Sequence, residues 1–260
     1  MDRRVNLNAD LGESFGAWTM GADERILPLI GSANLACGFH AGDPLVMRRT
    51  LRLAKQNGVS VGAHPAFPDL QGFGRRRMAI PAEELEAIIL YQIGALSGLA
   101  RAEGLTVSHV KPHGALSNMA CENAQMAETV ARAVKAHDSG LILLAPALSP
   151  MAEAGKAAGL PVVQEIFADR AYLDDGQLVP RTRPDAMIHG AEAALAHVEA
   201  MLDEGAIICA SGKRLPAGIG SICVHGDGPE AVDIARHLNQ ALRAKGFDLV
   251  GLPSLGTATG

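Results

Sequence analysis

The chain has 260 residues, of which 48% are hydrophobic and only 3% aromatic, and its formal net charge at pH 7 is −5. A chain of this length fits one large domain or a single α/β barrel, and it can bury enough surface to fold without disulfides. The net charge is too small to indicate nucleic acid or a membrane surface as a partner, so we expect neither.

The cysteines and the N-terminus indicate a cytoplasmic protein. The cysteines lie far apart and form no Cys-x-x-Cys pair, as is typical of small buried residues in a reducing compartment. The first residues lack the apolar segment of a signal peptide, and no stretch approaches the ~18 consecutive apolar residues of a membrane span. The cysteines are Cys37, Cys121, Cys209 and Cys223.

Strand and helix patterns alternate along the chain. Strands are expected at residues 5–10, 34–39, 59–63, 107–112, 141–144, 162–168 and 221–224. Helices are expected at residues 43–57, 81–103, 121–137, 148–158, 188–204 and 229–245. The first helix has the clearest bounds, because Asp43-Pro44 forms an N-terminal cap and Asn57-Gly58 a stop signal.

This alternating order predicts parallel strands joined by right-handed crossovers. Roughly seven strands are enough to close a (β/α) barrel of the TIM-like type, and a doubly wound open sheet is the alternative. In both folds the ligand lies at the carboxyl ends of the strands. We expect one catalytic domain over residues 1–252, followed by a flexible tail over residues 253–260.

The strands also show period-two alternation, which separates an apolar face from a polar one. In the first strand Val5, Leu7 and Ala9 share one face, and Asn6, Asn8 and Asp10 share the other. If the apolar faces meet the helices, the polar faces point into the barrel. Because packed barrels are usually filled by branched aliphatic residues, small and polar interior residues predict a deep pocket.

Four histidines, His40, His64, His113 and His225, each follow a predicted strand and precede a turn. One such histidine is often a hydrogen-bonded structural residue, but four in equivalent positions favour a shared catalytic site. The histidines that fall in helical segments are interpreted as ordinary surface residues: His137, His197 and His237.

Asp10 and Glu13 form a carboxylate pair at the end of the first strand. Asp10 is interpreted as a general base or a metal ligand, and Glu13 is equally well read as a helix cap with a salt bridge. Lys111 lies between two histidines on a face that should be buried. It suits a Schiff-base nucleophile or a cation that holds an anion, and a structural ion pair with Asp10 or Glu165 is the alternative.

Arginines near the predicted strand ends suggest an anionic ligand. Asp169 is assigned to the catalytic group and is followed by Arg170, a guanidinium suited to carboxylate or phosphate. Arg75, Arg181 and Asp227 are assigned with Glu13 and Arg170 to substrate binding. Histidine and carboxylate ligands from separate strands also suit zinc or another divalent metal, but the spacing selects no ligand set, so the metal stays open.

Seven motifs in order along the chain closely resemble the LamB/YcsF family. They include Leu7-Asn8-Ala9-Asp10-Leu11-Gly12-Glu13, Gly62-Ala63-His64-Pro65, Val110-Lys111-Pro112-His113-Gly114 and His225-Gly226-Asp227-Gly228. The others lie at residues 32–43, 167–170 and 178–181. The resemblance implies a seven-stranded barrel related to glycoside hydrolase/deacetylase barrels. One departure is Ser117, where the resemblance implies a tyrosine that would offer a pocket wall and a proton donor.

The resemblance also implies a reaction, the ATP-dependent hydrolytic opening of 5-oxo-L-proline (pyroglutamate) to L-glutamate. In that family the activity belongs to a multi-subunit 5-oxoprolinase, so subunits B and C are expected partners and ATP is used by the complex. The chain itself has no Gly-x-x-x-x-Gly-Lys-[Ser/Thr] nucleotide-binding motif.

The residues suggest roles in such a reaction. Asp10 or a neighbouring histidine would activate water, Lys111 or Arg170 would hold the substrate carboxylate, and His113 or His225 would protonate the leaving nitrogen. Two other functions stay open. One is a metal-dependent deacetylase or amidohydrolase that acts alone, and the other is a non-catalytic subunit that binds a lactam or a sugar.

Overall fold

The computed structural model describes residues 3–225 and 230–255. Seven parallel strands form a closed barrel, because the last of them pairs with both the sixth and the first. The strands are β1 (Arg4–Leu11), β2 (Ser32–Ala36), β3 (Ser60–His64), β4 (Val107–Val110), β5 (Ile142–Pro146), β6 (Val162–Phe167) and β9 (Ser221–Val224). The predicted seven-stranded barrel is therefore confirmed, and the open-sheet alternative is wrong.

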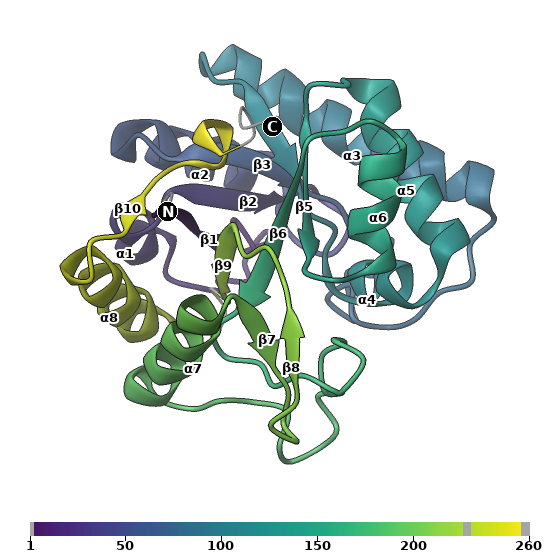
Figure 1. Cartoon of the computed structure of the whole chain (residues 1–260). Coiled ribbons are helices and arrows are strands. Elements are labelled where there is room, and N and C mark those ends of the chain that lie inside the picture. Colours follow the sequence, from purple (N-terminus) through teal and green to yellow (C-terminus); the bar gives the residue numbers. More distant parts are fainter. Residues whose placement is uncertain (1–2, 226–229, 256–260) are drawn as a thin grey trace.

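Helices cover the outside of this barrel (Figure 1). They are α2 (Pro44–Asn57), α3 (Ala82–Ala102), α4 (Gly114–Glu122), α5 (Ala124–His137), α6 (Pro150–Ala157), α7 (Ala191–Glu204) and α8 (Ala231–Ala244). Helix α2 begins where the sequence indicates, since the Asp43 carboxylate accepts hydrogen bonds from the N–H groups of Leu45 and Val46. It ends at Gly58, which has a left-handed conformation.

Two features depart from the expected elements. Helix α4 begins directly after His113 and was not predicted, and Asn123 separates it from α5 by capping the second helix. The strands β7 (Ala206–Ile208) and β8 (Arg214–Pro216) form an antiparallel hairpin outside the barrel, next to α7 in Figure 1. These strands are three residues long, and β8 is largely exposed, so they lack the apolar alternation that marks a strand.

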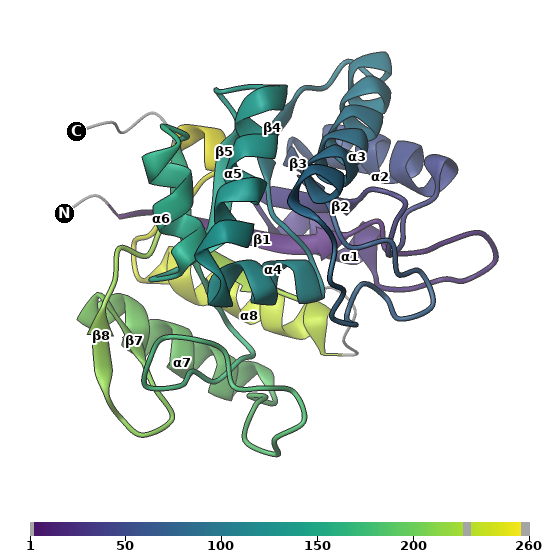
Figure 2. The ribbon, with the colours of Figure 1, turned by 90° about the vertical axis from the view of Figure 1, so that its right-hand side faces the viewer.

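Shorter elements connect β1 to β2 and follow α8. The helix α1 (Asp23–Ile26) and the 3-10 turn η1 (Leu27–Leu29) lie between β1 and β2. Near the C-terminus, β10 (Asp248–Leu249) pairs with the start of β1 and is followed by the 3-10 turn η2 (Leu252–Ser254). Figure 2 shows β1 running from the side of the chain ends toward a long loop at the right, so the strands' carboxyl ends lie on that right-hand side.

The alternation in β1 has the predicted orientation. Its apolar residues belong to the main hydrophobic core, whereas Asn8 donates hydrogen bonds to Ser221 (2.8 Å) and accepts one from Asn34 (2.8 Å) inside the barrel. His109 Nε2 lies 2.9 Å from the amide oxygen of Asn34. The predicted deep pocket does not extend to the depth of Asn8, Asn34 and His109. These side chains are fully buried and hydrogen-bond to one another, so they fill this part of the interior.

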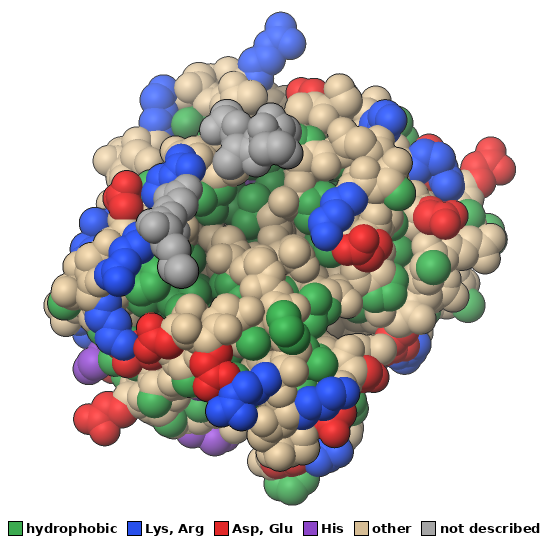
Figure 3. All heavy atoms as spheres, viewed as in Figure 1, with side chains coloured by type: hydrophobic (Ala, Val, Ile, Leu, Met, Phe, Trp, Pro, Cys, Tyr) green, Lys and Arg blue, Asp and Glu red, His purple; other side chains and the backbone are tan. Residues whose placement is uncertain are grey.

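In the described part of the chain, no helix is both long enough and apolar enough to cross a membrane. Figure 3 shows the face that is seen in Figure 1, and acidic and basic side chains both occur on it among uncharged and hydrophobic ones. This mixture agrees with the small net charge of the sequence.

Candidate functional site

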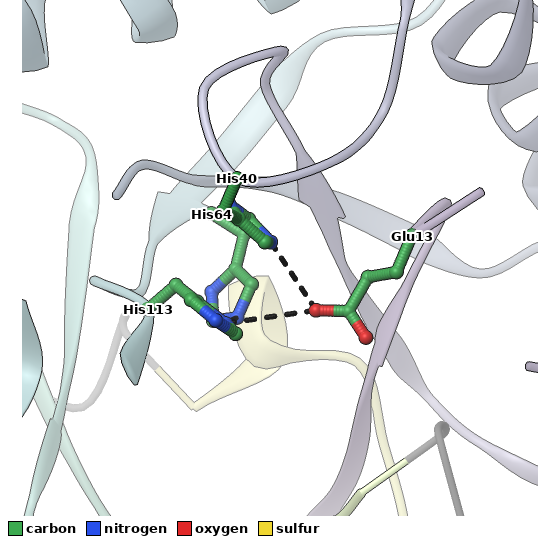
Figure 4. Close-up of side chains that lie close together, drawn as sticks. All are labelled: Glu13, His40, His64 and His113. Atoms are coloured by element: carbon green, nitrogen blue, oxygen red, sulfur yellow. Dashed lines mark hydrogen bonds and ion pairs between the residues drawn. The ribbon is translucent and has the colours of Figure 1, made fainter. Parts of the chain in front are cut away.

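The carboxyl ends of the first four strands bring one carboxylate and three imidazoles together. Glu13 follows β1, His40 follows β2, His64 ends β3, and His113 follows β4 as the N-cap of α4. Figure 4 shows Glu13 facing the three rings. Glu13 Oε1 lies 3.2 Å from His40 Nε2 and 3.6 Å from His113 Nδ1, and all four side chains are buried. The structure thus joins three of the four strand-end histidines with Glu13.

Each histidine of this cluster is held by its surroundings. His64 Nδ1 lies 2.6 Å from the carbonyl oxygen of Lys111, and His113 Nε2 lies 2.8 Å from that of Phe73. The rings of His40 and His113 stack at 3.8 Å between centroids. Burial, reinforced by the neighbouring imidazoles, lowers the pKa of both His40 and His113 well below the usual value. The rings are therefore neutral near pH 7 and offer lone pairs.

The loop that holds His113 carries Arg75, which was assigned from the sequence to substrate binding, but its contact with His113 was not predicted. Phe73 has a φ of +54°, which is rare for a residue with a side chain, and this conformation directs its carbonyl oxygen to His113. At Gly74, a Cβ atom would lie 2.8 Å from the His113 ring. The signal in the sequence was the glycine at position 74, which permits the close approach of the loop.

A buried ion-pair network lies beside the histidine cluster. Lys111 Nζ is 3.0 Å from Asp10 Oδ1, 3.3 Å from Glu165 Oε2 and 2.9 Å from Cys223 Sγ. Burial opposes the charge of Lys111, but Asp10, Cys223 and Glu165 outweigh burial and raise the lysine pKa well above its usual value. A charged, enclosed amine is not a Schiff-base nucleophile, so the geometry fits the structural ion-pair reading of Lys111.

The same network keeps Asp10 ionised. Burial alone would raise the Asp10 pKa, but the interactions with His64 and then Lys111 outweigh it and hold the pKa well below the usual value. Asp10 Oδ2 also lies 3.4 Å from His64 Nε2. Burial raises the pKa of the neighbouring Glu165. Of the two carboxyl groups, Asp10 is the one whose ionised form this network favours more strongly.

Asp169 and His225 form a second pair at the ends of β6 and β9. His225 Nδ1 lies 2.9 Å from each carboxylate oxygen of Asp169, and its ring stacks on that of Phe167. Burial opposes ionisation of Asp169, yet the interaction with His225 lowers its pKa. His225 also lies near Asp10, because one ligand atom from each of Asp10, Cys223 and His225 falls within 4.8 Å of the others. The pair is therefore part of the same site.

Arginines surround this second pair. Arg170 is buried and donates to the carbonyl oxygen of Val179 (2.7 Å), and its buried Nε has no hydrogen-bond partner among the described residues. Burial and then the charge of Arg181 lower the Arg170 pKa to about 10. Arg181 Nη2 lies 3.5 Å from His225 Nε2, and the Arg75 guanidinium lies over the Phe73 ring at 5.0 Å. Concentrated positive charge of this kind suits an anionic substrate group.

Several predicted residues lie elsewhere. His109 is below the site, between Asn34 and Ser108, and Asp227 lies outside the described residues. His197 is not an ordinary surface residue: it is half-buried, stacks on Tyr172 and lies 3.1 Å from the carbonyl oxygen of Arg170. His137 and His237 are exposed, as expected.

Comparison with known proteins decides the family, because residues 5–256 match the LamB/YcsF family. The chain belongs to the LamB/YcsF family. It is 61% identical to the 5-oxoprolinase A subunit of Azoarcus over 97% of this chain and 99% of the relative. It is 49% identical to the 5-oxoprolinase A subunit of Bacillus subtilis over 96% of this chain and 97% of the relative. The family recognised in the sequence is thus confirmed.

Solved structures of other proteins support the same fold for this LamB/YcsF member. The lactam utilization protein of Thermus thermophilus has a TM-score of 0.90 and 47% identity, over 95% of this chain and 99% of that one. The catalytic domain of a peptidoglycan N-acetylglucosamine deacetylase from Eubacterium rectale has a TM-score of 0.52 and 10% identity, over 96% of this chain and 89% of that one. The second likeness concerns the barrel alone, and it agrees with the expected deacetylase-type fold.

Proposed function

We propose that this chain is the A subunit of a 5-oxoprolinase, which opens 5-oxo-L-proline to L-glutamate by ATP-dependent hydrolysis. The observation that carries the proposal is 61% identity, over nearly the whole length of both chains, to a protein of that name. The site adds an ionised carboxylate, a carboxylate–imidazole pair and several arginines, which are groups that hydrolysis of a cyclic amide with an anionic substituent requires.

The need for ATP follows from the chemistry of the lactam. An amide carbonyl is a poor electrophile, and opening an unstrained five-membered lactam is unfavourable near neutral pH. Transfer of the terminal phosphoryl group of ATP to the amide oxygen leaves ADP and an activated carbon. A first water then adds to this carbon and the carbon–nitrogen bond breaks, which leaves the amine free and the carbon as an acyl phosphate. A second water hydrolyses this acyl phosphate, which releases phosphate and yields glutamate. Because the chain has no P-loop motif, we assign ATP use to the assembly with subunits B and C.

Asp10 is the proposed general base, since its pKa is held low and it lies between His64 and Lys111. Lys111 positions Asp10 and favours its ionised form. It does not touch substrate, because its amine is enclosed by protein side chains on several sides. A base of low pKa holds a proton weakly, so it acts best on a water molecule that is already attacking an activated carbon.

His225 is the proposed acid for the leaving nitrogen. Its Nδ1 donates to Asp169, which fixes the ring, and in the acid form Nε2 carries the proton that passes to the leaving nitrogen. Arg181, exposed and 3.5 Å from this nitrogen, is proposed to bind the substrate carboxylate with Arg75. Arg170 adds positive charge from the buried side. His40, His64, His113 and Glu13 form the opposite wall of the site.

The other two functions are not favoured. A stand-alone deacetylase or amidohydrolase fits the barrel, but the similar proteins are named as subunits. A purely lactam- or sugar-binding subunit does not require an acid–base pair such as Asp169 and His225. We also propose a cytoplasmic location, because ATP is the cosubstrate and the four cysteines carry free thiols.

The test is release of glutamate from 5-oxoproline and ATP by this chain alone, by subunits B and C alone, and by all three together. We expect glutamate only in the complete mixture, and we expect Asp10→Asn to abolish it there, with Asp203→Asn on the outer helix α7 as the matched control. Absence of glutamate from every mixture, with B and C shown to be competent, would overturn the proposal.

A further inference from the structure

We propose that Glu13, His40, His64 and His113 form a binding site for one divalent transition metal ion, with zinc as the best-fitting ion. These residues come from four consecutive strand ends, and one ligand atom from each lies within 4.8 Å of all the others. All four side chains are buried. Three imidazoles and one carboxylate are a ligand set that zinc commonly takes in proteins.

The hydrogen bonds of two histidines point to a cation. A carbonyl oxygen only accepts hydrogen bonds, so His64 Nδ1 and His113 Nε2 must carry the hydrogens that they donate to Lys111 and Phe73. A neutral imidazole has a single N–H group. The other two nitrogens, His64 Nε2 and His113 Nδ1, therefore present lone pairs to each other.

These two nitrogens are 2.9 Å apart. Two lone pairs at this distance repel unless a proton or a metal ion lies between them. A shared proton would serve these two nitrogens alone, whereas a metal ion at this place also meets the ligand atoms of His40 and Glu13. A metal ion removes the conflict, since two nitrogens about 2.1 Å from one ion lie about 3.0 Å apart at an angle of about 90°, as in a five-coordinate site, and about 3.4 Å apart at the tetrahedral angle. The observed separation therefore needs a shift of at most about 0.5 Å to hold zinc.

The outer contacts have the form that metal sites use. Metal-binding histidines usually donate their second ring N–H to a backbone carbonyl or a carboxylate, which fixes the tautomer and the ring orientation. His64 and His113 both do so. Among the described residues His40 Nδ1, by contrast, is buried without a hydrogen-bond partner, while its Nε2 lies 3.2 Å from Glu13 Oε1. His40 is therefore held by its stacking on His113 rather than by an outer hydrogen bond.

The charge at the cluster also fits a divalent ion. Glu13 is one carboxylate of the cluster, and Asp10 is a second carboxylate next to it, with Oδ2 3.4 Å from His64 Nε2. The donors are nitrogen and carboxylate oxygen, which favour zinc, cobalt, nickel or iron over magnesium or calcium. The inference is independent of the proposed reaction, because binding is measured on this chain without substrate or the B and C partners.

The experiment uses the purified full chain after treatment with a chelator. Zinc is added and binding is followed by calorimetry and elemental analysis, and cobalt is substituted to record its ligand-field spectrum. We expect one ion per chain. Replacing one ligand, as in His113→Ala or Glu13→Gln, should weaken zinc binding at least ~10-fold. His137→Ala removes an exposed histidine on α5 and is the matched control, which should bind zinc as the unchanged chain does.

Folding of the variants is checked by circular dichroism, and Glu13→Gln is included because it keeps the side-chain volume. Binding of less than one-tenth of an ion per chain, or unchanged zinc affinity in the double variant His64→Ala and His113→Ala, would overturn the proposal. A tetrahedral or five-coordinate cobalt spectrum with nitrogen and oxygen donors supports it, and a purely aqueous octahedral spectrum contradicts it.

Discussion

At the scale of single residues, the interior of the barrel depends on close fits between small and polar side chains. Gly62 in β3 shows this most clearly, because the ring of His109 occupies the place of a side chain. A Cβ atom on Gly62 would lie 2.2 Å from that ring. His109 cannot move away without breaking its contact with Asn34, which in turn holds Asn8 and Asp10. Position 62 therefore requires glycine for space rather than for backbone freedom.

We predict that Gly62→Ala destabilises the protein by about 1–3 kcal/mol or more, because overpacking in a filled interior forces side chains off their preferred positions. Chemical denaturation measures the change. Gly94→Ala is the control: Gly94 lies inside α3 with no atom near its missing Cβ, so alanine should stabilise the helix by about 0.5–1 kcal/mol. Equal effects of the two substitutions would contradict the steric argument.

Asp169 acts on the reaction through His225. Asparagine keeps the shape of the Asp169 side chain but removes its negative charge. That charge orients the His225 ring and stabilises its protonated form during the reaction. We predict that Asp169→Asn lowers kcat of the complete enzyme about 100-fold, within the range that general acid–base groups supply, with little change in KM. The pH profile of kcat should shift as well. A variant that changed KM alone would show that Asp169 binds substrate instead, and Asp203→Asn again serves as the control.

At the scale of secondary-structure elements, ion pairs join the outer helices. Glu103 ends α3 and accepts hydrogen bonds from Arg48 and Arg52 of α2, and Lys55 donates to its carbonyl oxygen. The hydrogen bonds from Arg52 and Arg48 lower the Glu103 pKa to about 2. Because this pKa lies below the value of about 4.3 in an unfolded chain, the bonds stabilise the fold above pH ~4.3 and the stabilisation is lost as the pH falls toward 2.

We therefore predict that Glu103→Gln lowers Tm at pH 7 and that the difference from the unchanged chain shrinks steadily below pH ~4.3. The effect should be modest and should weaken with salt, since surface ion pairs are screened. Thermal scans at several pH values measure it. A Tm difference that stayed constant down to pH 3 would mean that packing of the side chain, rather than its charge, links the helices.

The elements also show how much of the fold could be predicted from the sequence. The strands and helices of the barrel were predicted from alternation within the strands and from caps such as Asp43, because both signals are local. The hairpin of β7 and β8 was missed since its strands are too short to show alternation. In the site, the strand-end histidines were visible, but their grouping was not. That His225 pairs with Asp169 while His40, His64 and His113 share Glu13 depends on strand register and on loops such as Phe73–Gly74, which no local pattern reveals.

At the scale of the whole molecule, one end of the barrel carries the candidate site and the other end closes the hydrophobic core. The carboxyl ends of the strands hold the site, and the opposite end is closed by an apolar cluster of Ile142, Leu144, Val163 and Leu252. Leu252 belongs to η2, far from these strands in sequence, and its N–H donates to Ser32. Arg4 at the start of β1 also donates to the carbonyl oxygen of Ser254. The C-terminal segment is therefore part of the structure that closes the barrel, at least as far as Leu255.

This closure predicts a stability effect that is separate from function. Leu252 is fully buried, so Leu252→Ala should destabilise the protein by about 2–5 kcal/mol through lost burial and the cavity that remains. Leu45→Ala is the control, because Leu45 is 78% exposed and its truncation should change stability by less than about 0.5 kcal/mol. Denaturation by urea measures both.

Zinc affinity of folded Leu252→Ala should equal that of the unchanged chain, since the proposed metal ligands follow the strands at the other end. If the substitution weakened zinc binding as strongly as it weakened folding, the two ends would be coupled through the hydrogen-bonded interior. This interior runs from Ser32 to Asp10 through Asn6, Ser221, Asn8 and Asn34. Independent effects would instead show that this interior is rigid enough to isolate the site from the end that closes the fold.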